Sequence, residues 1–174
     1  HSGISVDLFE KRSGFGRKLL IAGSSGLNIS HSLPPEEFAS QYQGGPPLFW
    51  KGLLRDFGVK DWLTFIERKL GLETFLGTSR RYFVREMKAS GLLVAWRRHL
   101  EAGGVRFHSG SELTDYFEKD GIYHLFFGSR EILADHVVFA FGGGSWEDTP
   151  PAWPDLFIRK GVDCSPFVPA NVGY

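Results

Sequence analysis

Two glycine-rich segments of this sequence could hold a phosphate-containing ligand against the peptide backbone. The first runs from Gly14 to Asn28, and the second is Gly142–Gly144, directly after an apolar run. Glycine allows a ligand to approach closely, because a Cβ at the same position would collide with it. Arg17 and Lys18 lie in the first segment, where they could neutralise and grip a pyrophosphate or simply form a basic pair on the surface.

Four other residues fit a dinucleotide ligand. Glu10 ends an early apolar run, the position from which a carboxylate accepts hydrogen bonds from ribose hydroxyls in dinucleotide-binding folds. It could equally be a solvated carboxylate at the end of a strand. Gly23, Gly26 and Asn28 would let a planar ligand approach the main chain, and the alternative for them is a plain turn.

The elements that would position these residues include both strands and helices. Ile4–Phe9 predicts a strand, and the glycine-rich loop after it leaves room for at most one short helical turn. Pro34–Leu70 predicts two or three short helices, with proline and acids at their start and an amphipathic stripe further on. Thr74–Phe83 predicts a hairpin. Ser90–Ala102 predicts a helix with Ser90 as its N-cap.

The second half of the chain predicts a strand followed by a β-meander. Val105–His108 follows a tight turn as a strand, which completes the helix-turn-strand half of a βαβ unit. Asp120–Gly121 is a type I′ turn signal, and it predicts antiparallel pairing of Leu113–Lys119 with Ile122–Phe127. Ile132–Leu133 adds a third short strand.

The C-terminal third predicts one more strand and a connector. Val137–Phe141 is a continuous apolar run, which is the pattern of a strand buried on both faces of a parallel sheet. The glycines after it lie where α/β sheets bind ligands. Residues 150–174 are rich in proline and predict a connecting segment.

Composition argues against several classes of protein. Lys+Arg and Asp+Glu both number 20, and this zero net charge disfavours a nucleic-acid-binding protein. Cys164 is the single cysteine and the six histidines are scattered, so we expect neither an internal disulfide nor a metal site. No apolar run is long enough for a membrane helix, and we expect a protein of the reducing cytoplasm. No catalytic acid or base can be assigned.

Four segments resemble a bacterial FAD flavoprotein family that includes aminoacetone oxidase and bile-acid-reductase-like NAD(P)/FAD-dependent oxidoreductases. Gly16–His31 resembles the family signature, and Phe83–Ser90, Ala140–Trp146 and Pro166–Gly173 follow in the order of the family. The resemblance implies an α/β fold: a partial FAD/NAD(P)-binding Rossmann-like (three-layer ββα) domain with a small helical insertion and an antiparallel β-meander. Its domains would be residues 1–33 with 84–149, the insertion 34–83, and the connector 150–174.

The resemblance also implies the ligands and their contacts. FAD would be the cofactor, with NAD(P)H as a possible electron donor and a small molecule as substrate. Glu10 would hold the adenosine ribose with Lys11 beside it, and a strand near Glu112 and Leu113 would offer backbone groups to the adenine. The remaining implied residues would line the pyrophosphate and flavin side or pass close to the cofactor, and they are Arg17, Lys18, Gly23, Gly26, Asn28, Gly142 and Gly143.

This sequence departs from the family pattern at both ends. It lacks the opening strand and Gly-x-Gly-x-x-Gly turn, and also the C-terminal part that completes the flavin pocket, so we expect an internal portion of a flavoprotein domain. The strands Ile4–Phe9 and Val137–Phe141 would then have unpaired edges, which favours rearranged pairing or a homodimer. The leading hypothesis is an incomplete FAD-dependent oxidoreductase. The alternative is a non-catalytic fragment that binds no flavin and acts through association or small-ligand binding.

Overall fold

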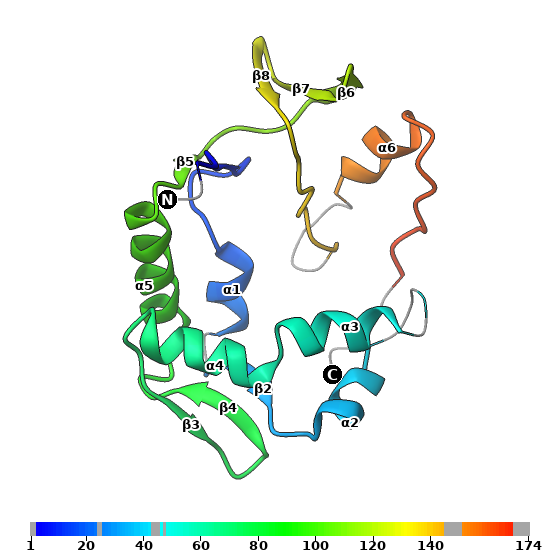
Figure 1. Cartoon of the computed structure of the whole chain (residues 1–174). Coiled ribbons are helices and arrows are strands. Elements are labelled where there is room, and N and C mark those ends of the chain that lie inside the picture. Colours follow the sequence, from blue (N-terminus) through cyan, green and yellow to red (C-terminus); the bar gives the residue numbers. More distant parts are fainter. Residues whose placement is uncertain (1–2, 24–25, 43–45, 47, 145–150, 169–174) are drawn as a thin grey trace. The chain divides into compact units, whose positions relative to one another are not determined.

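The protein is described by a computed structural model of the chain, in which residues 3–23, 26–42, 46, 48–144 and 151–168 are described (Figure 1). It contains both helices and strands. In chain order the elements are β1 (Asp7–Phe9), α1 (Arg17–Ala22), β2 (Asn28–His31), α2 (Pro35–Ser40), α3 (Phe49–Asp56), α4 (Val59–Arg68), β3 (Thr74–Leu76), β4 (Arg81–Val84), α5 (Ala89–Ala102), β5 (Arg106–His108), β6 (Asp115–Lys119), β7 (Ile122–Phe127), β8 (Arg130–Ala134) and α6 (Trp153–Ile158).

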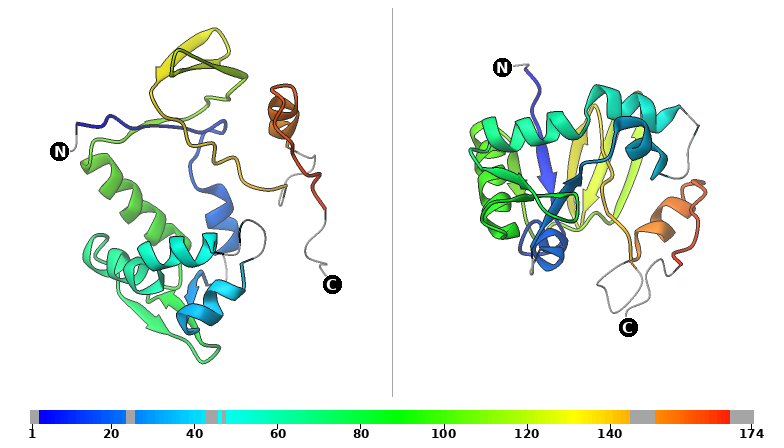
Figure 2. Two further views of the ribbon diagram at one scale, coloured as in Figure 1. Left: turned by 45° about the vertical axis from the view of Figure 1, so that its right-hand side comes forward. Right: turned by 90° about the horizontal axis from the view of Figure 1, so that it is seen from below.

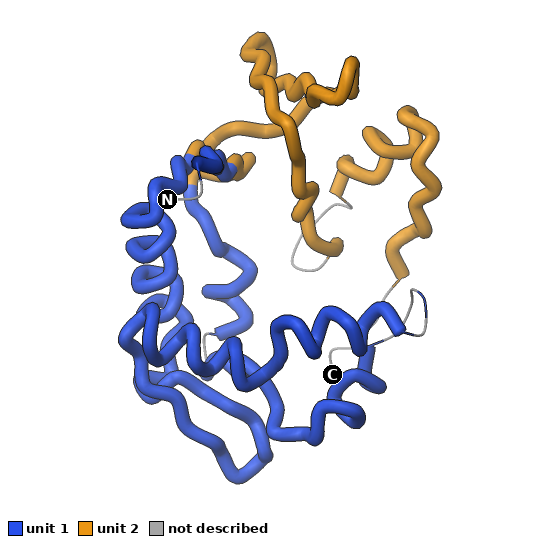
Figure 3. The backbone as a smooth tube through the Cα atoms, in the orientation of Figure 1, with its two compact units in different colours: residues 1–8, 14–107 blue, residues 9–13, 108–174 orange. Residues whose placement is uncertain are grey.

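The chain divides into two compact units (Figure 3). Unit 1 comprises residues 1–8 and 14–107, and unit 2 comprises residues 9–13 and 108–174. The boundary between them therefore passes through the strands β1 and β5. The domain boundaries expected from the sequence follow the resemblance rather than this division, and they stay a prediction.

The core of unit 1 lies between the helices α4 and α5, the strand β4 and the segment that follows α1. Its buried residues are Leu27, Ile66, Val84, Ala89 and Leu92. Ile66 and Leu92 are 0% and 1% exposed. Figures 1 and 2 show α1 and α5 side by side. The amphipathic stripe predicted from Val59 onward is confirmed, because Ile66 is its innermost member.

Two helices of unit 1, α2 and α4, begin at signals that the sequence carries. Pro35 starts α2 with two acids in its first turn, where acidic side chains interact favourably with the helix dipole. Asp61 accepts a hydrogen bond of 2.9 Å from the backbone N–H of Gly58 and so caps α4. The N-cap of α5 is Lys88 rather than Ser90, which lies inside the helix, so that prediction was wrong. The glycine-rich loop contains α1, six residues long, which exceeds the single turn expected.

A three-stranded antiparallel sheet closes unit 1, in the order β2-β4-β3. The pair β3–β4 confirms the predicted hairpin, and Phe75 pairs with Phe83 across it. Trp62 of α4 donates a hydrogen bond of 3.1 Å from its indole N–H to the carbonyl oxygen of Ile29 in β2. This bond fixes the helical segment to the edge of the sheet.

A second, two-stranded sheet pairs β1 with β5. The backbone N–H of Arg106 donates to the oxygen of Val6, and that of Glu10 donates to the oxygen of His108. The residue numbers rise together along both strands, so the pair is parallel. The guanidinium of Arg106 donates to both carboxylate oxygens of Asp7, which raises the pKa of Arg106 above its usual value.

Unit 2 contains the predicted β-meander, β6-β7-β8. Asp120 and Gly121 have φ angles of 53° and 80°, as a type I′ turn requires. Leu125, at the centre of the meander, is buried. Lys160 pairs with Asp115 at 2.7 Å, and this bond lowers the pKa of that carboxyl.

One prediction for the C-terminal third was wrong, and one element of it was not foreseen. Val137–Phe141 forms no strand, and Val138 is 90% exposed, so the run is not buried on both faces. Instead Phe139 and Phe141 contact Phe157 on one side of the segment, with ring centroids 5.0 and 6.0 Å apart. The proline-rich tail contains a helix, α6, whose first turn carries a proline.

Candidate functional site

The turn after β1 positions Glu10 in unit 2. The backbone N–H of Arg12 donates a hydrogen bond of 2.9 Å to Glu10 Oε1. The main chain of Glu10 is held on both sides, because its N–H donates to His108 at 2.9 Å and its carbonyl accepts from Ser111 N–H at 2.8 Å. Its other carboxylate oxygen, Oε2, has no protein partner among the described residues. Glu10 is therefore a half-buried, oriented carboxylate with one oxygen available to a ligand.

The second part of this site is the segment that follows Ser111. Glu112 and Leu113 lie between β5 and β6 in a segment that is neither helix nor strand, because β6 begins at Asp115. Within the described part of the chain, the backbone groups of Glu112 and Leu113 make no hydrogen bond. Two adjacent unpaired peptide groups can hydrogen-bond the edge of a planar heterocycle. The structure thus brings Glu10 and the 112–113 segment together.

Stacked aromatic side chains hold the end of β1, directly before the turn that carries Glu10. Phe9 stacks on His108 at 4.5 Å and on Phe127 of the meander at 4.2 Å. The last residue of β1 is thereby fixed against both β5 and β7. Lys11, which follows Glu10, is exposed.

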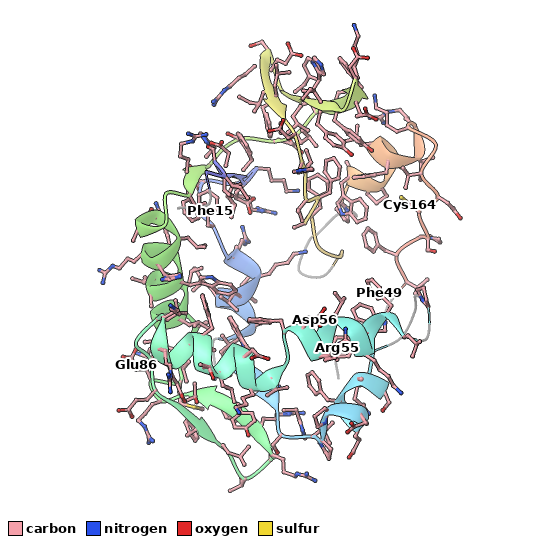
Figure 4. The ribbon with its side chains drawn as sticks, in the orientation of Figure 1. Phe15, Phe49, Arg55, Asp56, Glu86 and Cys164 are labelled. Atoms are coloured by element: carbon pink, nitrogen blue, oxygen red, sulfur yellow. The ribbon has the colours of Figure 1, made fainter. Side chains whose placement is uncertain are left out.

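In unit 1, α1 carries the predicted basic pair, with Arg17 exposed and Lys18 half-buried. The helix follows Phe15, which is labelled in Figure 4. The Phe15 ring meets that of Phe107 edge to face, with centroids 5.0 Å apart. Gly16 has φ 71°, and a Cβ there would lie 2.6 Å from Leu93 Cδ1. The start of α1 therefore depends on a glycine for both its backbone conformation and its packing.

The glycines at the end of α1 approach the protein itself. A Cβ on Gly23 would lie 2.4 Å from Ala89 Cβ, and one on Gly26 would lie 2.8 Å from Met87 Cε. Gly23 thus has a packing role, a reason that local sequence could not supply because Ala89 lies more than 60 residues away, whereas the neighbour of Gly26 is the flexible end of a methionine side chain. Their role toward a ligand, like that of exposed Asn28 at the start of β2, stays a prediction.

The second glycine segment lies in unit 2. Gly142 has φ 74°, which glycine adopts readily. Its carbonyl oxygen accepts a hydrogen bond of 3.1 Å from the indole N–H of Trp153 in α6. Sequence reasoning missed Trp153, although Pro154 beside it is a helix-start signal that could have identified α6.

The predicted cofactor residues therefore form two sets. Those in unit 2 are Glu10, Lys11, Glu112, Leu113, Gly142 and Gly143, and those in unit 1 are Arg17, Lys18, Gly23, Gly26 and Asn28. Only the first set shows the direct link between Glu10 and the segment carrying Glu112 and Leu113.

Other chemistries find little support in the described ranges. They contain no group of three or more His, Cys, Asp or Glu side chains placed to hold a metal ion. No described helix has the length and apolar character needed to cross a membrane. Cys164 is a half-buried free thiol that follows α6 (Figure 4). Burial raises the pKa of Tyr116, whose ring packs against Phe139 and Phe157, and this is a packing effect.

No curated protein sequence matches this chain significantly. Residues 1–152 match the family model described as HI0933-like protein Rossmann domain, which agrees with the parallel β1–β5 pair and the mixed α/β content of the chain. Because that match covers well over half of the 174 residues, the protein belongs to the HI0933-like family of FAD-binding Rossmann domains.

Proposed function

We propose that this chain binds the adenosine half of FAD through Glu10 and the 112–113 segment, as part of an FAD-dependent oxidoreductase. The observation that supports this is the hydrogen bond of 2.8 Å from Ser111 N–H to the Glu10 carbonyl. It places an oriented carboxylate, which can accept from a ribose hydroxyl, beside two peptide groups that can pair with adenine. The flavin would supply the redox chemistry, and the chain would supply position and electrostatics.

The finer assignment rests on the four resembling segments. We place the chain with the bacterial aminoacetone oxidase and bile-acid-reductase-like flavoproteins, with NAD(P)H as electron donor, a small molecule as substrate and the cytoplasm as location. Arg17 and Lys18 would neutralise the pyrophosphate, and the glycines of both segments would line the cofactor.

The direct test is flavin binding by the purified chain. Added FAD should remain with the protein through gel filtration, read from its absorbance near ~450 nm. Glu10→Gln should weaken binding by about tenfold to a hundredfold, because a hydrogen bond to a charged group contributes about 1.5–3 kcal/mol. Gln keeps the acceptor for Arg12 N–H, so the turn should persist. Asp163→Asn, an exposed charge change in unit 2, is the matched control.

Two outcomes would contradict the proposal. A wild-type chain that elutes colourless after incubation with FAD does not bind the cofactor. Equal affinities for the wild type and Glu10→Gln would show that FAD binds without the ribose contact proposed here.

Exposed apolar segments favour a second candidate, self-association of a flavin-free chain. Ile4, before β1, is 75% exposed, and Val138 is 90% exposed in a segment without strand partners in the described part of the chain. Both segments have apolar side chains and backbone groups that another strand would satisfy. Two copies could bury these side chains and pair these backbone groups if residues 4–8 of one copy paired with residues 137–141 of the other, in a closed two-fold arrangement.

The oligomeric state tests this candidate. Light scattering after gel filtration should give a dimer mass for the wild type and a monomer mass for Val138→Lys. Val162→Lys, a charge introduced at another exposed valine of unit 2, should remain dimeric. A wild type that is monomeric at high micromolar concentration would exclude the homodimer.

A further inference from the structure

The glycine turn, residues Gly142–Gly144, is contacted by side chains of the proline-rich tail. Trp153 donates the hydrogen bond of 3.1 Å to the carbonyl oxygen of Gly142. A Cβ on Gly144 would stand 3.5 Å from Phe167 Cγ and 3.6 Å from Pro151 Cδ, which are ordinary contact distances. The tail therefore covers one side of the glycine turn within unit 2.

The position of the Trp153 indole does not depend on this hydrogen bond alone. Its ring centroid lies 5.9 Å from that of Phe141, 5.7 Å from that of Phe157 and 5.8 Å from that of Phe167. The helix that carries it is anchored by buried Leu156. Because the surrounding rings hold the indole, its N–H is aimed at Gly142 before any ligand arrives.

The carbonyl of Gly142 and the N–H of Gly143 belong to one peptide plane. In a trans peptide the two groups point in opposite directions, so fixing one fixes the other. The chain contains no cis peptide in its described part. With the Gly142 oxygen held by Trp153, the Gly143 N–H points away from α6. Gly142 has a left-handed φ, which few residues other than glycine adopt. Because glycine has wide conformational freedom, a hydrogen bond such as that from Trp153 restricts the conformations of the turn.

We propose that Trp153 is a positioning residue for cofactor binding: its indole N–H sets the Gly142–Gly143 peptide in the orientation that the cofactor meets. This inference rests on the proposed FAD binding, and it extends the binding determinants into the tail. It assigns a role to α6, which the sequence pattern presented only as a connector.

The experiment compares Trp153→Phe, which retains an aromatic ring and loses the N–H donor, with Trp96→Phe in α5. Trp96 packs on Trp62 in unit 1 and serves as a matched control for the loss of an indole. Three readouts are taken on the full chain: amide hydrogen exchange at Gly142–Gly144, Tm, and the Kd for FAD with the visible spectrum of the bound flavin.

Trp153→Phe should speed exchange in the glycine turn and weaken FAD binding by about fivefold to tenfold, the effect of one lost hydrogen bond. It should also shift the flavin band, with the chain still fully folded at the temperature of the titration. Trp96→Phe should change neither the exchange in the turn nor the Kd. A merely structural role for Trp153 would lower Tm and leave the Kd and the flavin spectrum of the folded protein as in the wild type.

The outcomes separate the two proposals. A wild type that binds FAD with the same Kd and spectrum as Trp153→Phe overturns the role of Trp153 and leaves the proposed function standing. Unchanged exchange at Gly142–Gly144 in Trp153→Phe also overturns it, because the turn would then be fixed by other contacts. A wild type that binds no FAD overturns the proposed function and, with it, the cofactor role of Trp153.

Discussion

Gly23 lies so close to Ala89 that a methyl group on Gly23 would stand 2.4 Å from the Ala89 Cβ. Both residues are buried, one at the end of α1 and the other at the start of α5. The absence of a side chain at position 23 thus allows two helices from different parts of the sequence to meet. The sequence predicted close approach of a planar ligand to the backbone at Gly23, which stays a prediction, and the structure shows that α5 also approaches this position.

Gly23→Ala should therefore destabilise the protein by about 1–3 kcal/mol, the usual cost of forcing an extra methyl group into a packed site. Urea denaturation measures the free energy of unfolding. Gly14→Ala is the matched control, because a Cβ on Gly14 would meet no atom within 4 Å. Equal stability for the two variants would show that α1 can move away from α5 without cost.

Leu92 is one of the most deeply buried side chains in the core of unit 1. It is 1% exposed, and its replacement by alanine should cost about 2–5 kcal/mol because the methyl groups lost leave a cavity. Leu76→Ala, at a leucine that is 51% exposed in β3, should cost far less. Thermal unfolding followed by circular dichroism ranks the two variants, and a similar loss in both would contradict the burial of Leu92.

The pair Asp115–Lys160 makes part of the stability depend on pH. The Lys160 ammonium, and then the Tyr116 N–H, hold the pKa of the Asp115 carboxyl below its ordinary value of 3.8. A depressed folded-state pKa stabilises the protein above the unfolded-state pKa, and this contribution is lost as pH falls through the folded-state pKa. Because Asp115 is half-exposed, solvent screening keeps the contribution small.

Lys160→Met should raise the pKa of Asp115 toward its ordinary value, without reaching it, because the Tyr116 N–H bond remains. Carbon-13 NMR of the carboxyl group gives this pKa directly. Lys119→Met, at the exposed end of β6, removes a charge of the same kind and should leave Asp115 unchanged. A pKa of Asp115 that is insensitive to Lys160→Met would exclude the ion pair.

Gly121→Ala tests the turn of the meander. Gly121 has φ 80°, and a residue with a Cβ in the left-handed region costs about 1–2 kcal/mol. We expect a loss of that size in unfolding free energy. The control, Gly52→Ala, lies within α3, where a Cβ has open space and alanine favours the helix. The control should be neutral or slightly stabilising, and a stable Gly121→Ala would indicate a different turn.

The sequence predicted best where the signal and the structure are both local. Asp120–Gly121 specified its turn within two residues, and the stripe from Val59 specified the buried face of α4. Val137–Phe141 is an apolar run, but an apolar run alone does not specify a strand. Whether such a run becomes a buried strand depends on which strands lie beside it, and here its rings pack on α6 instead. No local pattern reports such a partner.

The residues of the candidate site likewise differ in whether local sequence could identify them. Glu10 could be singled out from its position at the end of a strand. Its contact with Ser111 joins residues about a hundred positions apart, so only the fold could show it. Trp153 was missed because the prolines around it suggested a linker, whereas Pro154 stands in the first turn of a helix.

The boundary between the two units passes through β1 and β5, and this limits which truncated products can contain a whole unit. Unit 2 takes its residues 9–13 from near the start of the chain and the remainder from His108 onward. A product that begins at His108 would lose Glu10 and three main-chain hydrogen bonds that residues 10–12 make with His108, Gly110 and Ser111. A product that ends at Phe107 would keep Glu10 but lose those partners. Neither half, expressed as one continuous piece, would contain the whole of the proposed adenosine site, whereas a circular permutant or co-expressed halves could restore it.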